Sequence, residues 1–268
     1  MNVARKSISY GFTLIEISIV MIIVGLVLGA VVIGQDLIAA AKARSQISQL
    51  EEFNTAVITF RIKYGQMPGD LLASDASNLG FTARSGARGH GDGNQLIERC
   101  NPESTFGVQK AHGCENILFW SDLSAAEMIE GTFTRATDAD MSSDNLDETL
   151  EYFPEAKAAR DAVVIMKDTS SRMWFILSGL NYQNAGGGTL SRKIPSAIAY
   201  SIDSKMDDGS PMTGRMRHFQ YNGAALSEFY FGNPTQTNTH CVFNNEYNLT
   251  STVRDNCSPA YRMEGSRR

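Results

Sequence analysis

The pattern of apolar and polar positions sets the first segment of the chain apart from the rest. Residues 17–34 are 18 consecutive residues without a charge, and residues 10–34 contain a single carboxylate, Glu16. At about 1.5 Å per residue, a helix of this length nearly crosses a hydrocarbon core of about 30 Å. A signal peptide usually has a shorter apolar region followed by a small-residue cleavage site, whereas this run continues into a helical pattern without a turn. The pattern therefore predicts a membrane anchor rather than a discarded signal peptide.

From residue 35 to residue 64 the pattern becomes amphipathic. Apolar residues recur every three or four positions, and charged residues occupy the other faces. Since neither proline nor glycine interrupts residues 35–64, residues 13–64 are predicted to form one helix of roughly 75–80 Å. Gly65 and Pro68 in "YGQMPGD" (64–70) end this helix. The apolar stripe consists of Ile47, Leu50, Phe53, Val57, Phe60 and Tyr64.

The remaining sequence predicts a globular domain of mixed helices and strands. Residues 71–115 are rich in glycine and are predicted to form loops, and residues 115–131 have an aromatic stripe at helical spacing. Residues 132–160 are polar and acidic, which predicts an excursion over the surface.

Strand-forming residues follow in residues 162–168 and 172–180, separated by a polar turn, so an antiparallel hairpin is expected. Residues 194–209 are predicted to be helical, and the segments after them to be coil or short strands. The sum is an α+β fold: a long N-terminal helix packed on one globular domain with a small antiparallel sheet.

The charge balance argues against one class of function. The formal net charge is −5, and it becomes more negative without residues 1–11, which carry Arg5 and Lys6. An acidic body without a basic run disfavours a broad phosphate-binding surface. Nucleic-acid binding is therefore not expected.

The four cysteines fall into two close pairs, Cys100 with Cys114 and Cys241 with Cys257. In an exported protein an even number favours disulfides, and four cysteines allow three connectivities, of which the local pairing is the simplest. A zinc site would need CxxC-type spacing, which the sequence lacks. Two disulfides that staple loops are therefore predicted, provided that the domain is exported.

Glu16 needs an explanation because a lone acid inside a membrane helix costs roughly 2.5–3.5 kcal/mol on insertion scales. One interpretation places it at the level of the lipid headgroups, where water solvates it. The other is that the chain is cut between Gly11 and Phe12, which creates an amino group four residues before Glu16. The new amine of a neighbouring copy would then neutralise the carboxylate in a low-dielectric setting.

The stretch Gly11-Phe12-Thr13-Leu14-Ile15-Glu16, with a basic leader before it and an apolar helix behind it, resembles the "GFTLIE" signature of type IV prepilins and type II secretion pseudopilins. The resemblance implies that a prepilin peptidase cuts after Gly11 and N-methylates Phe12. It also implies that Glu16 is the acid needed for assembly. Ile33 stands where many relatives have a proline, so the resemblance does not imply a helix break there.

The resemblance implies a structural subunit, not an enzyme. Its expected parts are a leader (1–11), a transmembrane and filament-core helix (12–34), an amphipathic helix (35–65) and a periplasmic or extracellular globular domain (66–268). The expected partners are prepilin peptidase, other pilin or pseudopilin subunits and an inner-membrane assembly platform. The subunit would sit in the bacterial inner membrane and then in a filament. The alternative is a periplasmic binding protein or enzyme, tethered by an uncleaved helix. "YGQMPGD" (64–70) looks like a turn common after the pseudopilin helix.

Two oxygen-rich loops are candidates for calcium, although no cofactor is required by the sequence. One contains Asp92-Gly93-Asn94 with Glu98, and the other Asp203, Asp207 and Asp208. Neither has the EF-hand order, and solvated turns in which aspartate and asparagine bond to their own backbone explain both loops as well. Some pseudopilins hold calcium in a carboxy-terminal loop, which favours the second. The sequence has neither an HExxH nor a GxSxG motif.

Overall fold

A computed structural model describes residues 13–81, 91–97, 115–133, 150–168, 170–181, 189–191, 193–219, 241–250 and 257–265. The chain divides into two compact units, Met1–Ala41 and Lys42–Arg268. The expected α+β fold, with a long N-terminal helix and a small antiparallel sheet, is confirmed.

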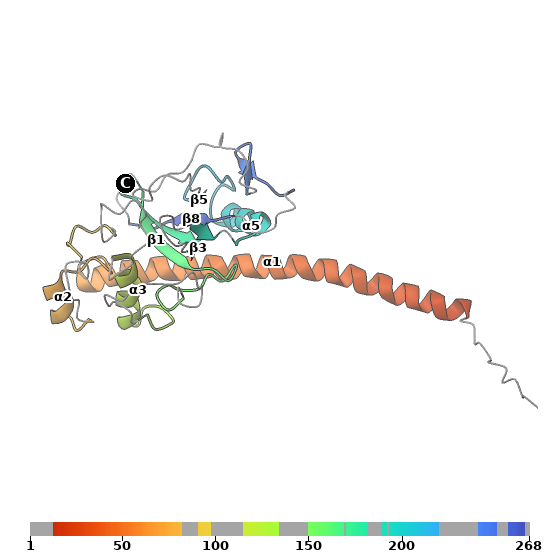
Figure 1. The fold of residues 1–268 in the computed structure, drawn as a ribbon, viewed down its shortest axis with the longest axis horizontal. Helices are drawn as coiled ribbons and strands as arrows, with labels where there is room; N and C mark the ends of the chain where they lie inside the picture. Colours follow the sequence, from red (N-terminus) through yellow and green to blue (C-terminus); the bar gives the residue numbers. More distant parts are fainter. Residues whose placement is uncertain are drawn as a thin grey trace, which may run out of the picture. The chain divides into compact units, whose positions relative to one another are not determined.

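Helix α1 (Leu14–Tyr64) is a single helix of 51 residues, drawn as an unbroken coil in Figure 1. It passes Ile33 without a break, as expected where proline is absent. Gly65 ends it in a left-handed conformation (φ 75°), and the Gly65 amide donates to the Arg61 carbonyl at 2.9 Å. The predicted helix 13–64 is therefore confirmed to within a residue.

Within the second unit, the predicted stripe of α1 is the side of the helix that is buried. Leu50, Val57 and Phe60 are fully buried and Phe53 nearly so. The stripe is wider than the apolar pattern indicated, because Gln46 and Gln49 on the same side are also buried.

Two further helices complete this side of the core: α2 (Ala73–Asn78) and α3 (Glu115–Ala125). Trp120 of α3 lies 4.9 Å from the ring of Phe53 of α1 and 6.1 Å from that of Phe175 of the sheet, measured between ring centroids. These aromatic contacts join α1, α3 and the sheet around one core. Helix α3 ends earlier than predicted because Glu127 adopts a left-handed conformation (φ 57°).

The main sheet has four antiparallel strands in the order β1-β2-β8-β5. The predicted hairpin is confirmed as β1 and β2, with Val163 opposite Leu177 and Lys167 opposite Met173. Every residue of β2 is buried, as expected for a central strand. The strands are β1 (Val163–Lys167), β2 (Met173–Leu177), β5 (Met216–His218) and β8 (Pro259–Arg262).

Smaller elements surround this sheet. The expected helix in 194–209 is confirmed as α5 (Ser196–Met206), which contacts the two-stranded hairpin of β6 (Val242–Phe243) and β7 (Glu246–Tyr247). A second hairpin pairs β3 (Gly179–Asn181) with β4 (Thr189–Ser191).

One expectation was wrong: residues 150–160 are not a surface excursion. Tyr152 and Phe153 are buried, and this segment is held on α1 by glutamine side chains. The Ala158 amide donates to Gln46 Oε1 at 2.9 Å, and Gln49 Nε2 donates to the Glu155 carbonyl at 2.8 Å. The acidic composition of residues 132–160 suggested exposure, but the two buried aromatic residues and the glutamines that bond to this segment outweigh it.

Candidate functional site

The start of helix α1 is organised by a reciprocal pair of side chains. The amide and the hydroxyl of Thr13 both donate to Glu16 Oε2, each at 2.8 Å. In return, the Glu16 amide donates to Thr13 Oγ1 at 3.3 Å. This is a capping box, in which a threonine before the helix and a glutamate three residues later satisfy amides that lack helical partners. Within the described residues, Glu16 Oε1 accepts no hydrogen bond.

The helix that follows carries an apolar surface on every side within the first unit. None of its most apolar 18-residue window is buried, and by length and composition it can cross a membrane. A helix that is apolar all round needs a membrane or a protein core to cover it. The exposed side chains include Leu14, Ile15, Met21, Ile22, Leu26, Leu28, Ile33, Leu37 and Ile38.

The predicted processing residues Gly11 and Phe12 lie outside the described residues, so their expected roles stay predictions. Of the predicted assembly residues, the structure places Glu16 in the first turn of α1. Thr13 was missed as a partner of Glu16, although the spacing T-x-x-E before an apolar run is a known signal for a capping box.

Residues 6–32 match the family model of the prokaryotic N-terminal methylation motif. The chain carries the prepilin-type motif of type IV pilins and pseudopilins. This prepilin-type motif includes Gly11, Phe12 and Glu16, and it extends through most of the uncharged run. No curated protein and no solved structure matches the chain. The match therefore concerns the N-terminal segment alone.

The candidate calcium residues Asp203, Asp207 and Asp208 do lie together, with one carboxylate oxygen of each within 4.8 Å of the others. Asp203 is fully buried and accepts a hydrogen bond from the Tyr247 hydroxyl at 2.8 Å and from the Gly209 amide at 3.1 Å. Burial raises the pKa of Asp203 to about 7, against the opposing effect of those two hydrogen bonds. A proton or a cation bound at this cluster would therefore neutralise the buried negative charge of Asp203.

The other two acids of the cluster are held by the loop that follows α5. Asp207 accepts the amides of Arg215 and Met216, the latter at 3.1 Å. Asp208 accepts the Ser210 amide at 2.9 Å and the Thr213 hydroxyl at 2.6 Å. These bonds fix where the carboxylates lie. Both amides bond to Asp207 Oδ2, so a cation would use Oδ1 of this residue, whereas an oxygen of Asp203 or Asp208 that accepts one hydrogen bond keeps a lone pair for a cation.

In the first candidate loop, Asp92-Gly93-Asn94, the side chains form the hydrogen bonds within the turn that the sequence indicates as an alternative to calcium binding. Asp92 accepts the Asn94 amide at 3.0 Å and the Asn94 side-chain nitrogen at 2.9 Å. The buried carboxylate of Asp70 holds the loop by accepting the amides of Gly93 at 2.9 Å and Gln95 at 2.5 Å. Burial raises the pKa of Asp70 to about 6. Glu98, the last residue of that candidate site, lies outside the described residues.

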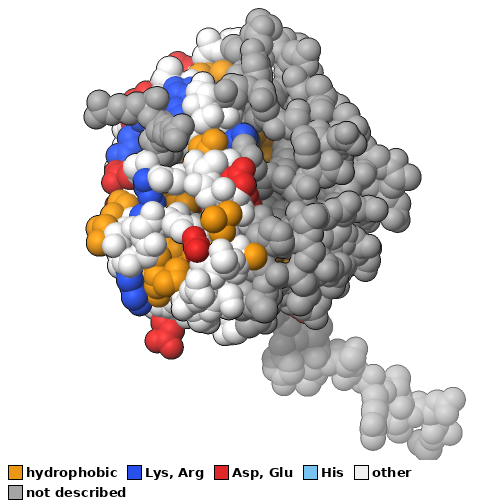
Figure 2. All heavy atoms as spheres, turned by 90° about the vertical axis from the view of Figure 1, so that its left-hand side faces the viewer, with side chains coloured by type: hydrophobic (Ala, Val, Ile, Leu, Met, Phe, Trp, Pro, Cys, Tyr) orange, Lys and Arg blue, Asp and Glu red, His pale blue; other side chains and the backbone are white. Residues whose placement is uncertain are grey.

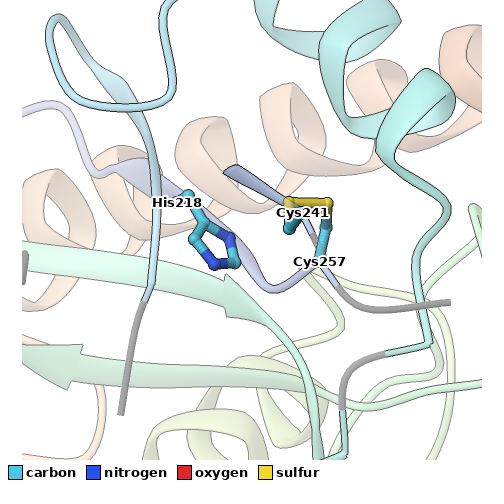
Figure 3. A group of neighbouring side chains, drawn as sticks. All are labelled: His218, Cys241 and Cys257. Atoms are coloured by element: carbon cyan, nitrogen blue, oxygen red, sulfur yellow. A yellow bond between two sulfur atoms is a disulfide. The ribbon is translucent and has the colours of Figure 1, made fainter. Parts of the chain in front are cut away.

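His218, Cys241 and Cys257 also lie close enough together to suggest a metal site. Figure 3 shows instead a disulfide between the two cysteines with the imidazole beside it. The predicted Cys241–Cys257 pairing is confirmed, and a disulfide leaves no thiolate to bind a metal. His218 Nδ1 accepts the Ser258 amide at 3.4 Å. Cys100 and Cys114, the other predicted pair, lie outside the described residues.

Figure 2 shows one face of the molecule, on which Lys and Arg side chains are interspersed with Asp and Glu over the described surface. A nucleic-acid interface would instead gather one sign of charge in a patch or stripe. This face therefore offers no support for phosphate binding.

Proposed function

We propose that this chain is a structural subunit of a type IV pilus-like or type II secretion pseudopilus filament. In this proposal prepilin peptidase cleaves after Gly11 and N-methylates Phe12, and the subunit assembles through its N-terminal helix. The observation that carries the proposal is the match of residues 6–32 to the methylation motif.

The exposed apolar half of α1 supports membrane anchoring followed by helix-to-helix packing. Burying a large aliphatic side chain is worth about 1.5–3 kcal/mol, so many exposed side chains would strongly favour either lipid or neighbouring helices. Contacts between copies that do not close into a ring would extend a filament. Arg5 and Lys6 would hold the leader in the cytoplasm and direct the globular unit to the periplasm.

Glu16 would set the register of addition by pairing with the Phe12 amine of a neighbour. The cost of a carboxylate in lipid supports this role, because a charge partner in the filament would remove the cost. The geometry is compatible with it, since both Thr13 donors use Glu16 Oε2. The proposed partners are therefore prepilin peptidase, other subunits of this kind and an inner-membrane assembly platform.

The mass of the mature N-terminus tests the proposal. We expect protein from peptidase-competent cells to begin with N-methylated Phe12, and a Gly11→Val variant to keep its leader. A Gly25→Ala variant, changed inside the apolar helix, is the matched control and should be processed normally. An unmodified Met1 start in the native chain would instead favour the alternative, a tethered periplasmic binding protein or enzyme.

A calcium ion at Asp203, Asp207 and Asp208 is a second proposal. The clustering of three carboxylates supports it, because calcium prefers such oxygen ligands. We expect calcium, but not magnesium, to raise the melting temperature of the full chain above its value in EDTA. The increase should disappear in Asp207→Asn and persist in Glu130→Gln, an exposed acid elsewhere. Equal melting temperatures with calcium and EDTA would exclude the site.

A further inference from the structure

The segment Glu246-Tyr247-Asn248-Leu249-Thr250 contains a pattern that the proposed function does not use. Asn248-Leu249-Thr250 is the acceptor pattern for N-linked glycosylation, in which the middle residue is not proline. Glu246 places an acid two positions before the asparagine, as in acceptor sequences of bacterial oligosaccharyltransferases. We propose that Asn248 is an acceptor site for an N-linked glycan.

The side chains of Asn248 and Thr250 are hydrogen-bonded to each other in the folded chain. Asn248 Oδ1 accepts the Thr250 hydroxyl at 3.0 Å and the Thr250 amide at 3.3 Å. Within the described residues, Asn248 Nδ2 makes no hydrogen bond. The oxygen is therefore engaged by the threonine that the pattern requires, and the nitrogen that must react is available.

The backbone holds Asn248 at a fixed place on the surface. Its amide donates to the Cys241 carbonyl at 2.7 Å, and its carbonyl accepts the Ser196 hydroxyl at 2.8 Å. Cys241 is itself fixed by its disulfide to Cys257. Leu249 is 54% exposed. Glu246 and Thr250 are also exposed, Asn248 is half-buried and Tyr247 is buried, so an enzyme can reach the Asn-Leu-Thr triplet from outside but not the tyrosine before it.

A second sequence of the same form provides an internal comparison. Asn256-Cys257-Ser258 also fits the pattern, but Cys257 and Ser258 are buried and Cys257 is in the disulfide. A transferase could not bind these residues in the folded chain. The structure thus selects Asn248 over Asn256.

The reaction needs an oligosaccharide linked to a polyprenyl diphosphate as its co-reactant. Asn248 Nδ2 attacks the anomeric carbon, so a carbon–nitrogen bond forms and the bond from that carbon to the diphosphate oxygen breaks. The polyprenyl diphosphate leaves with the electron pair, and a base of the transferase takes the amide proton. The proposal rests on the proposed function in one respect: the globular unit must reach the periplasmic side.

The test is to express the full chain in cells that contain a single-subunit bacterial oligosaccharyltransferase and its lipid-linked oligosaccharide. A flexible acceptor tag is appended after residue 268 as a reporter of location. Peptide mass mapping should find one glycan on Asn248. It should be lost in Asn248→Gln and Thr250→Ala, and retained in Thr250→Ser and Asn256→Gln.

The tag separates failure of this inference from failure of the proposed function. A glycosylated tag with unmodified Asn248 would overturn the inference alone. If both are unmodified while a control acceptor protein is modified in the same cells, the globular unit is not on the expected side. That result would overturn both the proposed orientation and the glycosylation site.

Discussion

Thr13 and Glu16 hold each other across the first turn of α1 through hydrogen bonds of 2.8, 2.8 and 3.3 Å. The glutamate therefore has a structural role in the single chain besides the intersubunit role proposed for it. These two roles make different demands on the side chain: capping needs an oxygen acceptor, whereas pairing with an amine needs a negative charge.

Substitution of Glu16 separates the two roles. Glu16→Gln keeps an oxygen that can accept the Thr13 amide but removes the charge, whereas Glu16→Ala removes both. If charge pairing drives assembly, we expect both variants to enter the membrane at least as well as the native chain and to form few or no filaments. Membrane fractionation and quantification of sheared filaments measure the two steps.

Thr13→Val is the complementary variant, because it removes the hydroxyl and leaves the charge of Glu16. Loss of a cap typically costs about 0.5–2 kcal/mol, so faster amide exchange is expected in the first turn. Thr13→Ser should restore protection. Filament formation by Glu16→Gln at the native level would show that capping, and not charge, is the property that matters.

Gly69 and Gly65 allow a test of crowding at similar φ angles, which are 86° and 75°. A Cβ added at Gly69 would lie 2.4 Å from the Glu115 carbonyl oxygen and 2.7 Å from the Phe119 nitrogen, whereas a Cβ at Gly65 would meet nothing within 4 Å. We expect Gly65→Ala to lower the free energy of unfolding by about 1–2 kcal/mol, the cost of the left-handed conformation. Gly69→Ala should cost more, because backbone must move. Equal urea midpoints for the two variants would contradict the crowding argument.

The stability of the globular unit should depend on pH through Asp203. Its pKa is about 7 in the folded chain against an ordinary 3.8, so the folded state holds its proton more tightly. The unfolding free energy is then highest below the ordinary pKa and falls as the pH rises through about 7. The fall is at most about 1.4 kcal/mol for each pH unit that separates the folded pKa from the ordinary one. Asp70, with a pKa of about 6, acts in the same direction.

Urea unfolding in EDTA at a series of pH values measures this dependence. Asp203→Asn cannot lose a proton, so the fall of stability with pH should become shallower in that variant. Glu130→Gln, an exposed acid away from the cluster, serves as the control. A native slope unchanged in Asp203→Asn would mean that Asp203 is not the group responsible.

The Cys241–Cys257 disulfide closes a loop with a sequence separation of 16. Loops of that size are stabilised by about 3 kcal/mol in the chain-entropy model. The double variant Cys241→Ser/Cys257→Ser should lose about that much free energy of unfolding, measured without reductant. Reduction of the native chain should produce at least that loss, because it would also open the predicted Cys100–Cys114 pair. A double variant as stable as the native chain would show that the disulfide adds no stability.

The elements that the sequence predicted well are those with long or local patterns. Helix α1 followed from an uncharged run and an apolar stripe, and the β1–β2 hairpin from two strand-forming segments joined by a short turn. The prediction of the site was equally local. Glu16 could be identified because it is the only carboxylate in an apolar run, and the pair Cys241–Cys257 because its two members are near in sequence.

The predictions that failed concern partners that are distant in sequence. Gln46 and Gln49 carry no local signal for burial, yet they are buried because residues 155–158 supply their hydrogen-bond partners more than 100 positions away. The pairing of Trp174 in β2 with Arg262 in β8 likewise has no local signal, since β8 has only four residues. Thr13 is a different case: its T-x-x-E spacing was visible and was overlooked.

Strand β8 lies between β2 and β5, although it follows both in the chain. Since β8 joins those two strands, the main sheet cannot be complete before residues 259–262 have been made. A chain that is exported during synthesis would therefore cross the membrane before the main sheet is complete, so no folded sheet would have to be unfolded during export. If the globular unit is exported as proposed, the order of the strands delays completion of the sheet until residues 259–262 have crossed the membrane.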